Sequence, residues 1–424
     1  LEHVAQASID ALYHFQGVSR AGLDDDLVMA LVRDCARARE NRRGALVVTG
    51  ADLSLPEGLR GVVTRSALPG PTEQELRTLL GQVVRDVSER RHVELDMDRE
   101  EIARLLRHLS GLTLLEAEKT LTRAVVEDGV LNADDLGLVA DAKRSLVEQG
   151  GVLEYTPVEA SLAGVADLEG FKSWLSHRTA VVRHPDRARA AGLPFPRGVL
   201  LLGVPGCGKS LAAKAVAAEW HLPLLRLDPS GLYNKYIGES EKNFRRAMDT
   251  AERMAPVILW IDEIEKAFAT GGSEDGGVSQ RVLGTFLSWM QERSGDVFVV
   301  ATANDVQRLP PEFLRKGRFD EVFFVDLPDA ATRAEILRIH LADRDADPDA
   351  FPLAELAAAC EGFSGSELEQ AVVSVQYAAF AEGGEIRPDR LSEELRRTRP
   401  LSVTMAEPIS ALRRWAEGRT VSAN

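Results

Sequence analysis

The sequence predicts an α/β protein: a P-loop parallel sheet with helices on both faces, followed by a small all-α subdomain. Three observations carry this prediction. Residues 203–210 read GVPGCGKS and match the phosphate-binding pattern GxxxxGK[ST]. Apolar runs of strand length then alternate with runs of helical periodicity, as in βα units. One of those apolar runs ends in the acidic pair Asp262 and Glu263.

The octapeptide lies between the apolar run 198–202 and the helix-forming run 211–220. Glycines let the backbone come close to phosphates, so that its N–H groups and the helix N-terminus face the anion. Lys209 would reach the β- and γ-phosphates, and the Ser210 hydroxyl would coordinate Mg²⁺. We therefore expect ATP and Mg²⁺ as ligands. The residues expected to hold them are Gly203, Pro205, Gly206, Cys207, Gly208, Lys209, Ser210 and Leu211.

The later segments follow in chain order. Strands are expected at 222–228, 257–262, 297–302 and 321–326, with helices at 239–254 and 279–292. Helices at 331–341 and 366–379 indicate the all-α subdomain. An amphipathic helix within 403–419 places Leu412, Trp415 and Ala416 on one face, and residues 420–424 are expected to be disordered. The predicted domains are 155–329 for ATP binding, 330–400 for the α-helical lid and 401–424 for the terminal helix and tail.

Three polar residues at strand ends are candidate catalytic groups. Asp262 is placed to hold Mg²⁺ through water, and Glu263 to orient and deprotonate the attacking water. The alternative for this pair is an ordinary acidic strand end. Asn304 follows the next strand, where its side chain can hydrogen-bond the attacking water or the γ-phosphate. Asn is also a common residue at the end of a strand.

Arg315 and Arg318 precede the last predicted strand, too far along the chain to reach their own phosphates easily. Guanidinium groups stabilise charge on a transferring phosphoryl group and are often supplied by a neighbouring subunit. The alternative is a solvated basic turn, and oligomerisation decides between the two. Tyr236 and Ile237 form an apolar loop tip, which is typical of a binding loop. The alternative for them is a hydrophobic staple onto the following helix.

The composition restricts the class of protein. With 424 residues, 45% apolar and 28% charged, the chain is long enough for two or three globular domains. No apolar run approaches the ~18 residues of a membrane-spanning helix, and no secretory signal is visible. Cys35, Cys207 and Cys360 have no metal-ligand spacing, and a reducing cytoplasm fits them best. The net charge of −15 argues against a broad phosphate-binding surface, so no nucleic-acid partner is expected.

Six stretches of the chain together resemble one family. They read GVPGCGKS, YIGESEKNFR, VILWIDEIEKAF, VVATAN, LRKGRFDEVFFVDLPD and GFSGSELEQAV, and they are similar to the AAA ATPases of the FtsH, spastin and katanin branch. Within that branch the chain most resembles an uncharacterised Ycf-type family of plastids and cyanobacteria. That family shares the stretches LPFPRGVLL at 193–201 and PLLRLD at 223–228. The resemblance covers residues 155–424.

The resemblance implies a ring driven by Mg-ATP, most often a homo-hexamer, with the nucleotide between subunits. It implies that Arg315 and Arg318 are trans-acting arginine fingers and that Asn304 is the sensor residue. It also implies that Tyr236, beside Ile237, is the central-pore aromatic that grips an extended polypeptide client. The flexible acidic segment 270–277 is expected to form a second pore loop.

The same resemblance implies contacts with adenine and ribose. The residues concerned are Val165 and Ala166 in the segment 164–167, then His340 and Gly365. For His340 the alternative is a histidine on a helix surface. Cys207 and Ser210 stand where threonine is common in the family, and the backbone-built phosphate cradle tolerates both. The HExxH zinc motif of FtsH is absent from the sequence, so any degradation would need another protein.

Residues 1–150 carry no P-loop, yet they contain a faint repeat of the ATPase. The stretch from Val47 echoes the one from Val299, and the stretch from Gly111 echoes the one from Gly362. The two spacings are 64 and 63 residues. We therefore expect a degenerate AAA-like α/β domain without a P-loop, ending near the break at 149–151. The alternative is an unrelated α/β adaptor.

Two functions are compatible with these observations. The first is a ring that remodels or unfolds a protein client through pore loops, driven by ATP hydrolysis. The second is a scaffold whose assembly ATP controls, without threading of a client. A nucleic-acid motor is disfavoured by the acidic charge and by the lack of a basic-aromatic stripe.

Overall fold

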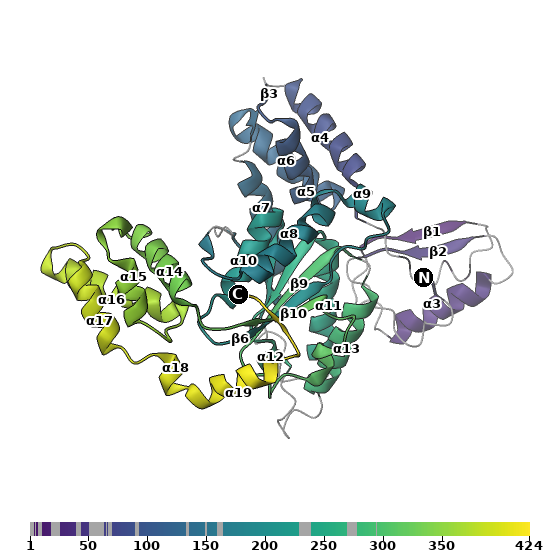
Figure 1. The fold of residues 1–424 in the computed structure, drawn as a ribbon. Coiled ribbons are helices and arrows are strands. Elements are labelled where there is room, and N and C mark those ends of the chain that lie inside the picture. Colours follow the sequence, from purple (N-terminus) through teal and green to yellow (C-terminus); the bar gives the residue numbers. More distant parts are fainter. Residues whose placement is uncertain are drawn as a thin grey trace. The chain divides into compact units, whose positions relative to one another are not determined.

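The structure is a computed structural model that describes residues 4, 6, 11–17, 26–39, 44–50, 63, 64, 66, 70–89, 93–132, 135–148, 151–158, 164–228, 239–268, 278–293 and 295–424. The chain divides into two compact units, Leu1–Pro69 and Gly70–Asn424 (Figure 1). The predicted boundary at 149–151 therefore lies inside the second unit. The domain limits expected from the sequence stay a prediction.

The first unit contains a βαβ arrangement. Strand β1 (Leu12–Phe15) pairs in parallel with β2 (Ala45–Val48), and helix α3 (Asp26–Arg39) lies between them in the chain. The amide of Thr49 extends the ladder by donating to the carbonyl oxygen of Phe15 at 2.8 Å. The predicted echo that starts at Val47 begins on β2, and its continuation at 51–60 lies outside the described residues.

The second unit begins with four helices, α4 (Glu73–Ser88), α5 (Arg99–Leu109), α6 (Leu114–Asp128) and α7 (Leu136–Glu148). A short parallel pair, β3 (Glu94–Leu95) with β4 (Val130–Leu131), connects them. Leucine and valine side chains from the helices form one apolar core. Helix α6 begins with a capping box. The side chain of Thr113 accepts a hydrogen bond from the backbone amide of Glu116, and the Glu116 carboxylate accepts one from the backbone amide of Thr113.

The centre of the second unit is a seven-stranded sheet with the order β11-β10-β6-β9-β8-β7-β5. Its strands are β5 (Leu153–Thr156), β6 (Gly198–Gly203), β7 (Leu224–Leu227), β8 (Val257–Ile261), β9 (Val297–Ala303), β10 (Glu321–Val325) and β11 (Val421–Ser422). Only the β5–β7 pair is antiparallel. The prediction of a mostly parallel α/β sheet is confirmed.

Strand side chains alternate between two cores, as the period of a strand requires. Leu200 and Leu202 face helices α11 (Glu239–Arg253) and α13 (Val278–Glu292). Val199 and Leu201 face helices α8 (Glu169–Arg183) and α10 (Lys209–Trp220) on the other side. Because both faces are covered, β6, β8 and β9 are buried along their whole length.

Between β10 and β11 the chain forms a small helical group, which we call the lid. It consists of α14 (Ala330–Ala342), α15 (Leu353–Ala359), α16 (Gly365–Glu382) and α17 (Pro388–Arg397), packed around their own apolar core. Helix α16 begins with a second capping box, formed by Ser364 and Glu367. The helix predicted within 403–419 is α19 (Ala406–Ala416), in which Leu412 and Ala416 are buried.

The prediction of disorder at 420–424 is wrong. Val421 and Ser422 form strand β11, which pairs in parallel with Phe323 and Phe324 of β10. The side chain of Ala423 is completely buried. The order comes from backbone hydrogen bonds to the open edge of β10, which a local sequence pattern does not reveal.

In the described part of the chain, no helix combines the length and the apolar character needed to cross a bilayer. Cys35, Cys207 and Cys360 are buried thiols, and none of them forms a disulfide.

Candidate nucleotide site

A cavity of about 580 Å³ opens at the carboxyl ends of β6, β8 and β9. Ligands of parallel α/β sheets bind at this edge. The described residues of its wall come from the octapeptide, from the strand ends, from the segment before α8 and from the lid. They are Gly164, Val165, Ala166, Asp167, Leu168, Pro205, Gly206, Cys207, Gly208, Lys209, Ser210, Leu211, Asp262, Glu263, Thr302, Asn304, Pro328, Ile336, Ile339, His340, Gly365, Ser366 and Glu369.

The octapeptide turns tightly between β6 and α10. Gly206 and Gly208 have φ angles of 76° and 84°, a region that side chains with a Cβ rarely adopt. A Cβ on Gly203 would collide with the carbonyl oxygen of Val325 on the neighbouring strand. No side chain caps the described N-terminus of α10, so its first amides are free to face an anion.

Lys209 is the first residue of α10, and it is buried. Its Nζ donates hydrogen bonds to the carbonyl oxygens of Gly203 at 2.9 Å and Val204 at 2.7 Å. Burial lowers the pKa of Lys209 to about 8, although nearby carboxylates act in the opposite direction. A phosphate would offer this ammonium a charged acceptor in place of two neutral carbonyl groups.

Two hydroxyl groups donate hydrogen bonds to one carboxylate beside the octapeptide. The hydroxyl of Ser210 donates to Oδ1 of Asp262 at 3.0 Å, and that of Thr302 donates to the same oxygen at 2.6 Å. Hard oxygen donors of this kind are the ligands that Mg²⁺ prefers. The donor set of Ser210 and Asp262, beside a glycine-lined phosphate cradle, therefore fits a Mg²⁺–nucleotide complex.

Glu263 and Asn304 lie together, as the sequence predicts. The side-chain amide of Asn304 donates to Oε1 of Glu263 at 3.2 Å, and Lys266 pairs with Oε2 at 2.7 Å. The backbone of Glu263 has a φ of 49°, and its amide donates to the hydroxyl of Thr302 at 3.0 Å. This geometry turns the Glu263 side chain toward the cavity and holds it next to Asn304.

The lid closes the opposite wall. The amide of Ser366 donates to the carbonyl oxygen of Gly206 at 3.0 Å, so the N-terminus of α16 contacts the octapeptide. A Cβ on Gly365 would lie 3.2 Å from the same oxygen. His340 lies on the cavity wall with 22% of its side chain exposed, and burial lowers its pKa. Burial therefore favours the neutral form of its imidazole.

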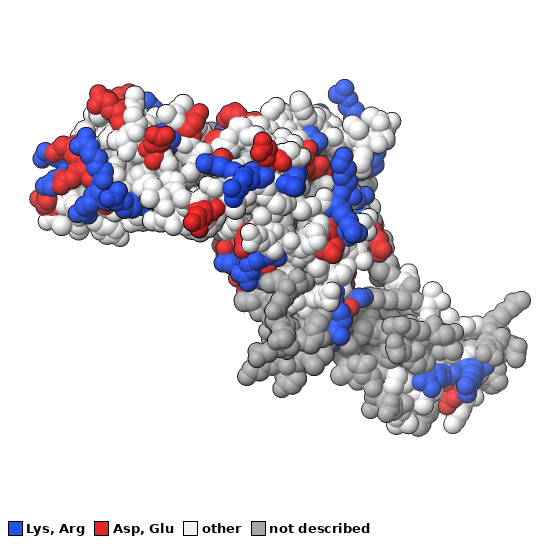
Figure 2. All heavy atoms as spheres, turned by 60° about the horizontal axis from the view of Figure 1, so that its bottom comes forward, with Lys and Arg blue, Asp and Glu red and all other residues white. Residues whose placement is uncertain are grey.

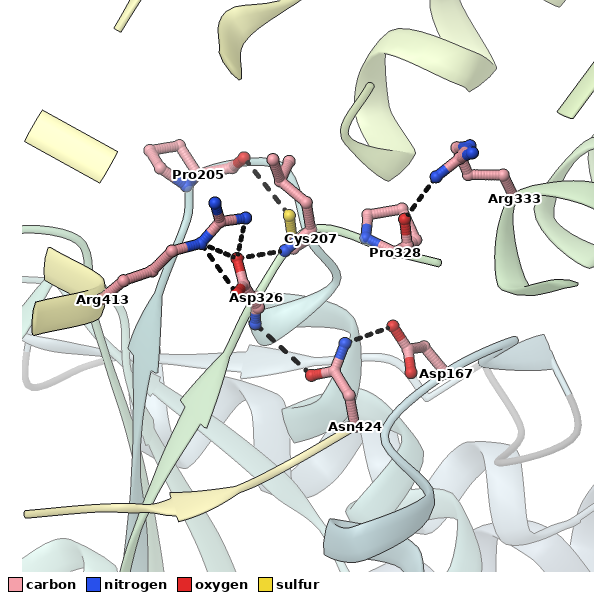
Figure 3. A network of polar contacts seen from close by, with 9 residues as sticks. Asp167, Pro205, Cys207, Asp326, Pro328, Arg333, Arg413 and Asn424 are labelled. Carbon is pink, nitrogen blue, oxygen red and sulfur yellow. Dashed lines mark hydrogen bonds and ion pairs between the residues drawn. The ribbon is translucent and has the colours of Figure 1, made fainter. Parts of the chain in front are cut away.

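Val165 and Ala166 line the cavity from the segment that precedes α8. Asp167 follows them, and burial raises the pKa of its carboxyl group. Figure 3 shows that Asp167 lies beside the side chain of Asn424, which in turn lies beside Asp326. The tail of the chain therefore contacts the nucleotide-site wall.

The two predicted fingers are not in the cavity. Arg315 is exposed, and Arg318 is buried with its guanidinium donating to the carbonyl oxygen of Glu312. Neither arginine lines the described cavity wall. Tyr236, Ile237 and the expected second pore loop at 270–277 lie outside the described residues.

The structure adds residues that the sequence analysis did not select. Thr302 bridges Asp262 and Glu263, and Glu265 accepts the backbone amides of Asn304 and Asp305. Thr302 lies in β9, two residues before Asn304, which directly follows the strand, so strand periodicity would place both side chains on one face. For Glu265, which lies in a four-residue turn with Ile264, Lys266 and Ala267, no local pattern in the sequence indicates this role.

The comparisons with known proteins agree with this geometry. The sequence model of the family described as "ATPase family associated with various cellular activities (AAA)" matches residues 199–327. A second model, described as "SpoVK-like AAA ATPase, second domain", matches residues 74–150.

Three curated relatives illustrate the similarity. The "Uncharacterized AAA domain-containing protein ycf46" of Guillardia theta is 36% identical over 397 residues, which are 93% of this chain and 77% of that protein. An "ATP-dependent zinc metalloprotease FtsH" of Acidothermus cellulolyticus is 34% identical over 247 residues, 57% of this chain and 36% of that protein. A "Cell division cycle protein 48 homolog" of Archaeoglobus fulgidus is 37% identical over 191 residues, 44% of this chain and 26% of that protein. The chain therefore belongs to the AAA family of ATPases.

Proposed function

We propose that this ATPase uses Mg-ATP and assembles into a homo-hexameric ring. The ring would remodel or unfold a protein client through its pore loops. One observation supports the assembly into a ring. The described cavity wall brings together Lys209, Asp262, Glu263 and Asn304, but it contains no arginine. Phosphoryl transfer in this class of site needs a guanidinium group for the developing charge. A second copy of the chain would supply it from Arg315 and Arg318.

The residues of the cavity would divide the chemistry. Mg²⁺, when bound, supplies positive charge beside the phosphate oxygens, and Ser210 and Asp262 would hold it. Lys209 binds the terminal phosphates through its ammonium group. The Glu263 carboxylate accepts the proton of the attacking water, and Asn304 fixes that carboxylate at 3.2 Å. Val165, Ala166, His340 and Gly365 form the wall for the adenosine moiety.

The ring is tested by ATP hydrolysis as a function of protein concentration, together with mass from light scattering in ATP. We expect specific activity to rise steeply as the ring-sized mass forms. Arg318→Ala should abolish the rise. Because Arg318 is buried, the exposed Arg315→Ala is the second variant, and Lys316→Ala in the same turn is the matched control. Activity that is independent of concentration, or of both arginines, would contradict a shared site.

Mixing two inactive variants makes this test sharper. Glu263→Gln lacks the base and keeps the arginines, whereas Arg315→Ala keeps the base. In a mixed ring, a Glu263→Gln subunit would present its Arg315 to an intact cavity, so we expect activity to return. If the arginines act within their own chain, no mixture recovers activity.

The alternative function is a scaffold whose assembly ATP controls. Tyr236→Ala separates it from threading, with carboxymethylated α-lactalbumin as the unfolded polypeptide probe. A threading ring should lose stimulation by this polypeptide and keep its basal ATPase activity. For a scaffold, the substitution should change neither.

We also propose that residues 1–150 derive from an AAA module without a P-loop. The match of residues 74–150 to a SpoVK-like AAA domain supports this. The start of α6 repeats the start of α16, with a positive-φ glycine, Gly111 at 89° and Gly362 at 81°, before each capping box. An unrelated α/β adaptor would not be expected to share that local arrangement.

The charge distribution supports a protein client over nucleic acid. Figure 2 shows basic and acidic side chains interspersed on one face of the molecule. On the lid, Arg390 pairs with Glu382, and Arg397 pairs with Glu394. Such pairs neutralise the cations that a phosphate backbone would need. The cytoplasmic location stays a prediction from the sequence.

A further inference from the structure

The segment 164–168 forms one wall of the cavity and leads directly into α8. Its last residue, Leu168, has a φ of 73°, a conformation that a leucine keeps only where surrounding contacts hold it. Each carboxylate oxygen of Asp167 accepts one hydrogen bond. Oδ1 accepts the amide of Leu168 at 2.7 Å, and Oδ2 accepts the side-chain amide of Asn424 at 2.8 Å. One of the two hydrogen bonds that Asp167 accepts therefore comes from the far end of the sequence.

The tail also provides a hydrogen-bond acceptor for a backbone amide at the start of α8. Leu168 offers no side-chain cap, and the amide of Phe171 donates to the carbonyl oxygen of Ala423 at 3.2 Å. Gly170 lets the tail backbone pass, because a Cβ there would lie 2.6 Å from the carbonyl oxygen of Ser422. An amide in the first turn of a helix has no partner within the helix, so the tail supplies a bond that α8 lacks.

The tail is itself fixed to the sheet and to α19. The amide of Ala423 donates to the carbonyl oxygen of Phe324 at 2.9 Å, which continues the β10–β11 ladder. The side-chain oxygen of Asn424 accepts the amide of Asp326 at 3.4 Å. Arg413 of α19 reaches both oxygens of Asp326 at 2.8 and 2.9 Å (Figure 3). Asn424 thus connects β10 and α19 to the cavity wall.

We propose that Asn424 is a positioning residue for the nucleotide, and that β11 holds the segment 164–168 in its binding conformation. This inference rests on the proposed ATP site. Asn suits the position because its oxygen accepts from Asp326 while its amide donates to Asp167. Displacement of the tail would weaken nucleotide binding, and nucleotide would in turn protect the tail, because coupling between sites is reciprocal.

The test measures the affinity of the full chain for fluorescent ADP in the wild type and in Asn424→Asp. The variant keeps the size of the side chain, removes its donor and places a second carboxylate beside Asp167. We expect affinity to fall about three- to tenfold, with the turnover at saturating ATP changed less than about twofold. Val421→Thr, at an exposed position of β11 three residues before Asn424, is the matched control and should bind as the wild type does.

A double variant in which residues 167 and 424 exchange their side chains tests the same contact independently. In Asp167→Asn with Asn424→Asp, the amide of residue 167 donates to the carboxylate of residue 424, while that carboxylate still accepts from Asp326. Affinity should recover relative to Asn424→Asp alone. Amide hydrogen exchange in a peptide spanning 164–175 should rise in Asn424→Asp and return toward the wild-type rate in the exchanged pair.

The outcomes separate the two levels of the proposal. If Asn424→Asp binds ADP as tightly as the wild type, or if the exchanged pair is no better than the single variant, the positioning role is wrong and the ATP site stands. If the wild type itself binds no ADP, the proposed ATP site is wrong, and the positioning role is overturned with it.

Discussion

The carboxylate of Glu265 accepts the backbone amide of Asn304 at 2.9 Å and that of Asp305 at 3.3 Å. Glu265 is 2% exposed, and burial raises the pKa of its carboxyl group. It stands in α12 (Ile264–Ala267), the turn that begins directly after Glu263. The loop after β9 is therefore fixed to the same turn that presents the expected base, and the distance between Asn304 and Glu263 follows from this attachment.

Substitution of Glu265 should impair hydrolysis more than binding. Glu265→Ala leaves two partly buried amides without this acceptor, and the loss of such partners costs about 1–3 kcal/mol. We expect the kcat to fall about tenfold to a hundredfold, with KM for ATP changed less than about threefold. Glu265→Gln keeps one acceptor oxygen and should recover part of the activity. Steady-state kinetics of the two variants measure this difference, and a change confined to KM would contradict it.

Glu263→Gln should separate binding from hydrolysis. The amide has the size of the carboxylate and cannot accept the proton of water, so ATP binding persists while turnover falls about a hundredfold to ten-thousandfold. Binding is measured with a fluorescent ATP analogue, and turnover by phosphate release. Wild-type turnover in this variant would show that another group acts as the base.

The affinity for ATP should fall as the pH rises above about 8, the value to which burial lowers the pKa of Lys209. Phosphate oxygens favour the protonated ammonium, so binding raises this pKa and takes up a proton when Lys209 is neutral beforehand. Below that pH, Lys209 is protonated both before and after binding, and its contribution is flat. The loss is at most tenfold per pH unit. Equilibrium titrations between pH 7 and 9.5 measure the slope, which Lys209→Met should remove.

The sequence predicts the strands of the central sheet well because their burial is continuous. The strands β6, β8 and β9 are buried on both faces, so each reads as an unbroken apolar run. The glycine pattern of the octapeptide likewise has a local cause, since Gly206 and Gly208 need positive φ angles. These elements depend little on distant partners.

Three of the missed features depend on distant partners. Strand β5 has one fully buried residue, Leu153, and exists because it pairs with β7. The tail pairs with β10 across about a hundred residues of chain, and nothing in 420–424 shows that edge. The role of Glu265 depends on a loop some forty residues away. Pairing of this kind follows from topology, which periodicity alone does not specify.

The buried amine of Lys143 in α7 should make the stability of the protein depend on pH. Its side chain is 1% exposed, and its Nζ has no hydrogen-bond partner among the described residues. Burial lowers its pKa to about 7, well below the value of an exposed lysine. Between about pH 7 and 10 the unfolded chain therefore binds a proton that the folded helix does not, so stability rises with pH, by at most about 1.4 kcal/mol per unit.

Lys143→Met keeps an unbranched side chain, one atom shorter, and removes the buried amine, so the helices α5 to α7 should become more stable at neutral pH. Hydrogen exchange of peptides from 99–148 in the full chain measures this local stability. We expect slower exchange in Lys143→Met, with less dependence of protection on pH after correction for intrinsic rates. Lys119→Met, an exposed lysine on α6, is the matched control and should behave as the wild type does. Faster exchange in Lys143→Met would contradict this prediction and indicate that the buried lysine stabilises the folded helices.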